Sequence, residues 1–184
     1  MGSHEQQNGR HVNSRLVDRP VVLVGMMGVG KTSIGKRLAA NLGLDFVDAD
    51  EEIERAAGMS IAEIFEKFGE PYFRDGERRV IARLIDGTPK IIATGGGAFI
   101  NDETRAVILE RALSIWLDAD IKILAERVSR RNNRPLLVGR DPVEVLTELG
   151  NIRGPIYAAA NIHVRSDTSP HARTIDIILE ALGQ

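Results

Sequence analysis

The segment from Gly25 to Thr32, GMMGVGKT, fits the pattern G-x-x-x-x-G-K-[ST] and directly follows a short apolar run. Glycines at these spacings let successive backbone N–H groups converge on phosphate oxygens, and a helix that begins here adds the positive end of its dipole. We expect Lys31 to bridge β- and γ-phosphates and Thr32 to ligate Mg²⁺. A glycine-rich turn with a surface lysine is the alternative, which the correct flanks disfavour. The motif predicts nucleoside triphosphate binding and does not identify the acceptor.

Two carboxylates, Asp48 and Asp50, follow the next apolar run. If the strand is extended through residues 45–50, both side chains point the same way. One then suits a water-mediated Mg²⁺ contact, and the other can accept a hydrogen bond from an acceptor hydroxyl. An N-cap with an acidic first turn of the following helix is the structural alternative. Proximity to the phosphate loop favours the functional interpretation.

Three arginines could bind anions. Arg74 in FRDGE lies three residues before Glu77, so the two can form a helical pair that also sets the guanidinium for a planar, bidentate partner. Arg134 lies in the basic, proline-punctuated segment RRNNRPLL, where a solvated turn and a flap that reaches transferring phosphate are both open. Arg153 in RGPIY is either a surface charge or a second clamp for an anionic acceptor.

Gly95, Gly96 and Gly97 form a third unusual segment, in IIATGGGAF. Three adjacent glycines cost backbone entropy on folding, so something must approach this backbone closely. A second phosphate loop is one interpretation. Because Gly25–Thr32 already serves that purpose, the acceptor side of the site is the better one, with Gly95 as the turn out of the strand.

The elements that must position these residues alternate along the chain. Short apolar runs at 21–25, 45–50, 91–95, 114–118 and 162–166 indicate buried parallel strands, and amphipathic helical segments separate them. The alternation predicts a doubly wound α/β fold with a five-stranded parallel sheet. In such a sheet, ligands bind beyond the carboxyl ends of the strands, which is where the motifs lie.

Composition excludes several classes of protein. The chain has 184 residues, of which 43% are hydrophobic and 27% charged, so one soluble globular domain is expected. A net charge of −2 gives no reason to expect nucleic acid or a membrane surface as partner, and the absence of cysteine excludes disulfides and thiolate metal sites. The four histidines lack metal-ligand spacing. We expect a cytoplasmic enzyme.

In chain order, GMMGVGKT, DAD, FRDGE, GGG, RPLL and RGPIY closely resemble the motifs of the shikimate kinase family, over about residues 20–182. The resemblance implies a nucleoside-monophosphate-kinase-like fold with substrate-binding and lid segments. The implied reaction is phosphorylation of the 3-hydroxyl of shikimate by ATP and Mg²⁺, in chorismate and aromatic amino-acid biosynthesis.

The resemblance also implies residue roles. Catalysis falls to Lys31, Asp50 and Arg134. The residues implied to bind ATP are Gly28, Val29, Gly30, Lys31, Thr32, Ser33, Arg127 and Arg134. Those implied to bind shikimate are Asp50, Arg74, Gly96, Gly97 and Arg153. Thr32 binds the metal directly and Asp48 through water.

The expected organisation is a disordered leader at 1–18 and one kinase domain at 19–184, with an acceptor-binding segment at 48–80 and a lid at 128–141. ATP and shikimate are the expected partners, and the chain is expected to be a monomer. The alternatives are a related kinase acting on gluconate or a nucleoside monophosphate, and a non-catalytic nucleotide-binding paralogue. The absence of a guanine-reading [NT]-K-x-D segment and of G-x-G-x-x-G after a strand disfavours GTP-binding and dinucleotide-binding proteins.

Overall fold

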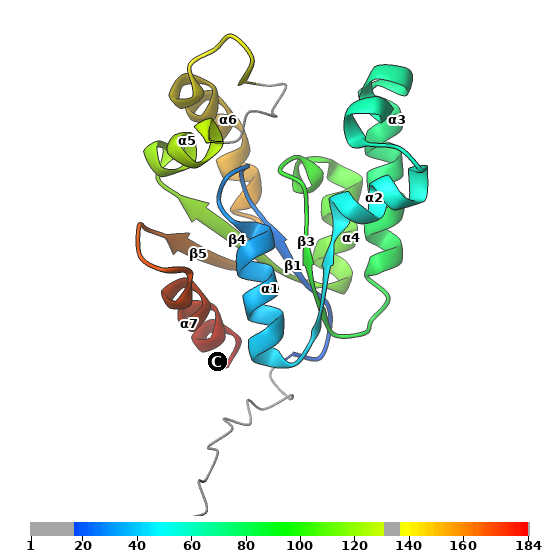
Figure 1. Ribbon diagram of the computed structural model, residues 1–184. Coiled ribbons are helices and arrows are strands. Elements are labelled where there is room, and N and C mark those ends of the chain that lie inside the picture. The colour runs from blue at the N-terminus through cyan, green and yellow to red at the C-terminus, as the bar shows by residue number, and fades with distance from the viewer. Residues whose placement is uncertain (1–16, 131–136, 184) are drawn as a thin grey trace, which may run out of the picture.

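Five parallel strands form the centre of the protein (Figure 1). The computed structural model describes residues 17–130 and 137–183. The strands are β1 (Val21–Val24), β2 (Asp45–Asp48), β3 (Lys90–Ala93), β4 (Leu113–Ala119) and β5 (Ile162–Ser166). Their spatial order is β2-β3-β1-β4-β5, so β1 lies between β3 and β4. The five-stranded parallel sheet that the sequence predicts is confirmed.

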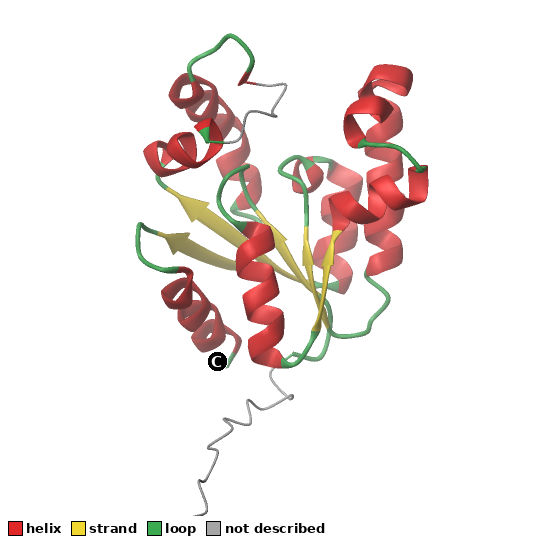
Figure 2. Ribbon diagram, viewed as in Figure 1, coloured by secondary structure: helices red, strands yellow, loops and turns green. Residues whose placement is uncertain are grey.

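Helices enclose the sheet on both faces. They are α1 (Lys31–Leu42), α2 (Ala49–Ala57), α3 (Ile61–Leu84), the 3₁₀ turn η1 (Ala98–Ile100), α4 (Asp102–Arg111), α5 (Ile121–Ser129), α6 (Pro142–Tyr157) and α7 (His171–Leu182). In Figure 1, α1 and α7 lie in front of the sheet and α4 behind it. All five strands point their carboxyl ends toward one edge (Figure 2). Beyond that edge, α2 and α3 lie on one side and α5 and α6 on the other.

The central strands β1 and β3 are mostly apolar and form the core, whereas the edge strand β2 has no buried residue. All residues of β1 are inaccessible to solvent, as are Ile91 and Ile92 of β3. Ile34 and Leu38, one turn apart on α1, pack against this layer. Val17 is also buried in the core, at 8% exposure, so the leader boundary predicted at residue 18 is too late by at least two residues. The rest of that predicted leader, 1–16, lies outside the described residues.

Several helix ends follow the signals in the sequence. Ser60 and Glu63 form a reciprocal capping box at α3, and Gly43 ends α1 in the left-handed conformation. Asp141 caps α6 ahead of Pro142. Within α3 the backbone is kinked at Gly69, where φ is 79° and ψ is 174°.

Candidate active site

The phosphate-loop segment connects β1 to α1 at the centre of the carboxyl edge. Strand order reverses at β1, which makes this edge the expected ligand crevice of a doubly wound sheet. Gly25 leaves the strand with φ 141°, and a Cβ there would lie 2.3 Å from the carbonyl oxygen of Leu117. Glycine is therefore required for the loop to pass β4.

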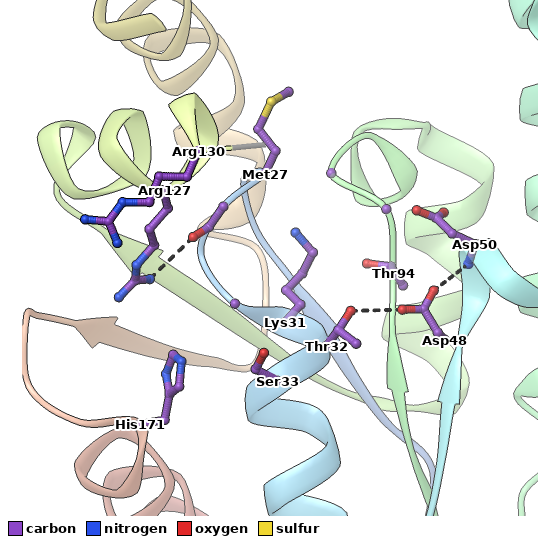
Figure 3. A pocket seen from close by; sticks show the side chains of 14 residues that line it. Met27, Lys31, Thr32, Ser33, Asp48, Asp50, Thr94, Arg127, Arg130 and His171 are labelled. Carbon is purple, nitrogen blue, oxygen red and sulfur yellow. Dashed lines mark hydrogen bonds between the residues drawn. The ribbon is translucent and has the colours of Figure 1, made fainter. Parts of the chain in front are cut away.

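Lys31 is the first residue of α1 and is 9% exposed. Its ammonium donates to the carbonyl oxygens of Gly25, at 2.6 Å, and Met26, at 3.0 Å. The side chain therefore crosses the loop and presents its charge at the mouth of the pocket (Figure 3). This is the placement expected for a lysine that neutralises nucleotide phosphates.

Asp48 is the N-cap of α2, one of the two interpretations that the sequence left open, and it also contacts the phosphate loop. Its Oδ1 caps α2 by accepting from the N–H groups of Asp50, at 2.9 Å, and Glu51, at 3.4 Å. Its Oδ2 accepts a 2.9 Å hydrogen bond from the hydroxyl of Thr32. These two oxygen donors come together beside the loop, and such hard oxygen ligands fit Mg²⁺.

Asp50 differs from expectation in its local structure. The predicted strand over 45–50 is wrong at its end, because the cap made by Asp48 starts α2 at Ala49 and places Asp50 in its first turn. The two carboxylates still reach the same pocket (Figure 3). Burial raises the pKa of Asp50, and the charge of Asp48 adds to the effect, although Lys31 and Arg74 oppose it.

The loop after β3 brings each of its three glycines against a different polar side chain. A Cβ on Gly95 would lie 2.9 Å from Oδ1 of Asp50, and one on Gly97 would lie 2.5 Å from Nη2 of Arg74. The Cβ position on Gly96 is 3.6 Å from Nη1 of Arg153, an ordinary contact. Gly95 and Gly97 are therefore constrained by the side chains they touch.

Arg74 is held by a buried partner. Its Nη1 donates to Glu77 at 2.8 Å, and the Glu77 side chain is 1% exposed. Burial raises the pKa of Glu77, against the opposing charge of Arg74. The helical pair predicted from the sequence is thus present, and it fixes the guanidinium beside Gly97.

Tyr157 and Arg153 approach the same loop from α6. The Tyr157 hydroxyl and, at 3.4 Å, the Arg153 guanidinium both donate to the carbonyl oxygen of Gly96. Tyr157 is 1% exposed and stacks on Phe99. Because a trans peptide points C=O and the next N–H in opposite directions, this anchor also fixes the N–H of Gly97. Sequence reasoning quoted Tyr157 within RGPIY but gave it no role.

Arg127 of α5 closes the other side of the phosphate loop. Its Nη1 donates to the carbonyl oxygens of Gly28 and Val29, both at 3.3 Å. The predicted Arg134 and residues 131–136 of the predicted lid lie outside the described residues.

A cavity of about 440 Å³ joins these groups (Figure 3). Predicted site residues that line it are Gly28, Gly30, Lys31, Thr32, Ser33, Asp48, Asp50, Gly96 and Arg127. Val29 is fully buried. Arg74, Gly97 and Arg153 do not line it but adjoin it through the glycine loop. Sequence reasoning missed the lining residues Met27, Thr94, Arg130 and His171. Met27, Thr94 and Arg130 lie within segments singled out from the sequence but were given no role there, and His171 lies outside those segments.

The fold and this site define a P-loop kinase of the nucleoside-monophosphate-kinase-like type. A family model described as shikimate kinase matches residues 27–183. The shikimate kinase of Caulobacter vibrioides is 61% identical over 166 residues, which cover 90% of this chain and 83% of that one. The chain belongs to the shikimate kinase family.

Solved structures agree with this assignment. Shikimate kinase from Acinetobacter baumannii in complex with shikimate has a TM-score of 0.83 and 36% identity, covering 89% of this chain and 92% of that chain. A gluconokinase from Sinorhizobium meliloti has a TM-score of 0.60 and 19% identity, covering 91% and 93%. The second likeness concerns the fold alone.

Within the described ranges, no helix is long and apolar enough to cross a membrane.

Proposed function

We propose that the protein transfers the γ-phosphoryl group of ATP to the 3-hydroxyl of shikimate, giving shikimate 3-phosphate and ADP in aromatic amino-acid biosynthesis. One observation carries the proposal. A half-buried carboxylate, Asp50, and a fixed guanidinium, Arg74, stand at opposite ends of one glycine loop, next to the phosphate loop. An acceptor with hydroxyls at one end and a carboxylate at the other matches this spacing of charges.

In this proposal, backbone N–H groups and the ammonium of Lys31 bind the phosphates of ATP. N–H groups of the loop between Gly25 and Thr32 and the start of α1 surround the phosphates, with Val29 and Ser33 among the residues that contact them. Lys31 neutralises β- and γ-oxygens. Thr32 and, through water, Asp48 would hold Mg²⁺, which when bound screens the phosphate charge. Within the described ranges, no three His, Cys, Asp or Glu side chains cluster as a metal site, so phosphate and water oxygens would complete the coordination.

The acceptor side orients one hydroxyl. Asp50 accepts the hydrogen bond of the reacting hydroxyl, whose oxygen attacks the γ-phosphorus while the bond to the bridging oxygen breaks. The hydroxyl proton passes to Asp50, and the raised pKa of this carboxyl favours that transfer. Arg74, Arg153 and the N–H groups of Gly96 and Gly97 bind the acceptor carboxylate. Within the described part of the chain, no acceptor takes up the N–H of Gly97.

Closure over the site is assigned to the segment 128–141, with Arg134 reaching the transferring phosphoryl group. Exclusion of water would limit hydrolysis of ATP. We further propose that the chain acts as a monomer in the cytoplasm. Sedimentation velocity measured with and without ATP and shikimate gives the oligomeric state of the chain directly.

The deciding experiment is a panel of acceptors assayed by ADP release: shikimate, gluconate, AMP and UMP, each with ATP and Mg²⁺. Activity with shikimate alone is expected. Turnover only with gluconate or a nucleotide would replace the proposal with another kinase. ATP binding without turnover on any acceptor would favour the non-catalytic alternative.

A matched pair of variants links the activity to this site. Arg74→Lys keeps the charge but cannot make a two-pronged contact, so KM for shikimate should rise strongly while ATP affinity stays nearly constant. Arg78→Lys is the control, because Arg78 lies one turn later on α3 and pairs with Asp75 and Glu103. This variant should leave both the KM for shikimate and the affinity for ATP unchanged. An equal loss of affinity for shikimate and for ATP in Arg74→Lys would indicate misfolding instead.

A further inference from the structure

His171 lies in the nucleotide cavity although no motif includes it. It is the first residue of α7, and its ring lines the same cavity as Lys31 and Arg127 (Figure 3). A Cβ built on Gly30 would lie 3.3 Å from Cε1 of His171 and 4.0 Å from Nε2. The Cε1–Nε2 edge of the ring therefore faces the backbone of the phosphate loop.

The two ring nitrogens have different surroundings. Nδ1 of His171 is buried, and no described residue hydrogen-bonds to it. Nε2 is not among the buried side-chain atoms of the described residues that lack a hydrogen-bond partner. Burying a donor or an acceptor without a partner costs about 1–3 kcal/mol, so a proton on Nδ1 gains no hydrogen bond. With the proton on Nε2, the ring presents its donor on the edge that faces the phosphate loop.

The charges around the ring keep it neutral. Partial burial lowers the pKa of His171, and the guanidinium groups of Arg127 on α5 and Arg37 on α1 lower it further. A cationic ring would also place a second N–H on the buried Nδ1. Near neutral pH, His171 thus offers one fixed hydrogen-bond donor in surroundings that already favour an anion.

We propose that His171 is a nucleotide-binding residue that donates a hydrogen bond from Nε2 to a non-bridging oxygen of the α-phosphate. The proposal rests on the ATP site of the proposed function. The ring lies on the side of the phosphate loop away from Asp48 and Asp50 (Figure 3). The γ-phosphate must face those carboxylates for transfer, so the ring meets the opposite end of the phosphate chain.

Two substitutions separate the nitrogens. In His171→Gln the side-chain amide nitrogen can occupy the place of Nε2, whereas in His171→Asn it reaches only the place of Nδ1. A hydrogen bond to a charged group contributes about 1.5–3 kcal/mol, so His171→Asn should raise Kd for both ADP and ATP by roughly 10-fold or more. His171→Gln should stay within about 3-fold of the unaltered protein. Kd for shikimate should not change.

The measurement is calorimetric titration of ADP and ATP without acceptor, with thermal unfolding of each variant as a check on folding. His163→Asn is the matched control and should leave both Kd values unchanged. His163 lies on the outer strand β5 and stacks on Trp116 of β4. Unchanged binding in His171→Asn overturns the proposal, and so do equal losses in Asn and Gln variants. A loss confined to ATP would move the contact to the γ-phosphate and overturn the α-phosphate assignment.

These outcomes are independent of the acceptor. A protein that fails to phosphorylate shikimate but shows the expected difference between Asn and Gln contradicts only the proposed function. A protein that phosphorylates shikimate but shows no such difference contradicts only the role of His171.

Discussion

Replacing Gly97 by alanine should act on the acceptor through Arg74. The new Cβ would lie 2.5 Å from Nη2, 2.8 Å from Nη1 and 2.9 Å from Cζ of Arg74. Favourable separations are about 3.5–4.0 Å, so the guanidinium must retreat by about 1 Å. Glu77, which accepts from Arg74 at 2.8 Å and is 1% exposed, resists that movement because it would lose its partner in a buried place.

The displaced guanidinium can no longer make its planar, two-pronged contact with a carboxylate. Loss of one charge-assisted hydrogen bond, about 1.5–3 kcal/mol, corresponds to a rise in KM for shikimate of roughly 10- to 100-fold. The Kd for ATP should stay within about 2-fold, since the three atoms nearest to the new Cβ all belong to Arg74 and none to the phosphate loop.

The assay is ADP release at varied shikimate and saturating ATP, with ATP binding measured separately by calorimetry. Gly76→Ala on α3 is the matched control, because nothing lies within 4 Å of its Cβ position and the residue has no assigned role in the site. KM values that rise equally in the two variants would refute the argument from Arg74. A fall in ATP affinity that precedes the loss of shikimate binding would assign the loop to the nucleotide instead.

Three further outcomes are expected at the same loop. Gly95→Ala places a Cβ 2.9 Å from Oδ1 of Asp50, so kcat should fall at least 10-fold with little change in Kd for ATP, and an unchanged kcat would contradict the role of Asp50. Tyr157→Phe keeps the ring stacking but removes the donor to Gly96, so KM for shikimate should rise about 3- to 10-fold in steady-state assays while kcat changes less. Burial and the charge of Asp48 raise the pKa of Asp50. As the pH is lowered, kcat/KM should therefore begin to fall above the ordinary aspartate pKa of about 3.9. A profile of kcat/KM that stays flat down to about pH 4 would contradict this.

Motifs at strand ends could be predicted because their neighbours in sequence determine them. The loop from Gly25 to Thr32 lies between an apolar run and a helix, and both are local properties of the chain. The pair Arg74 and Glu77 is also local, since residues three apart on a helix face each other. The strands could then be recognised from apolar runs, because parallel strands buried on both faces carry little else.

The contacts between distant segments could not be predicted in this way. Nothing near Gly97 in the sequence indicates that a guanidinium from α3 will rest on it, and nothing near His171 indicates the phosphate loop. The end of β2 was missed for a different reason. Asp48 satisfies both an N-cap and a strand end, and side-chain capping, which a strand pattern does not include, decides where the helix begins.

The glycine loop explains how one sheet can serve different acceptors. Asp50, Arg74 and Arg153 come from α2, α3 and α6, and the described structure joins all three through residues 95–97. In the proposed function the sheet and phosphate loop position ATP, and the gluconokinase likeness at 19% identity concerns this fold alone. We expect acceptor choice to depend on the side chains around the glycine loop. Substitutions that alter the acceptor without weakening ATP binding should concentrate there.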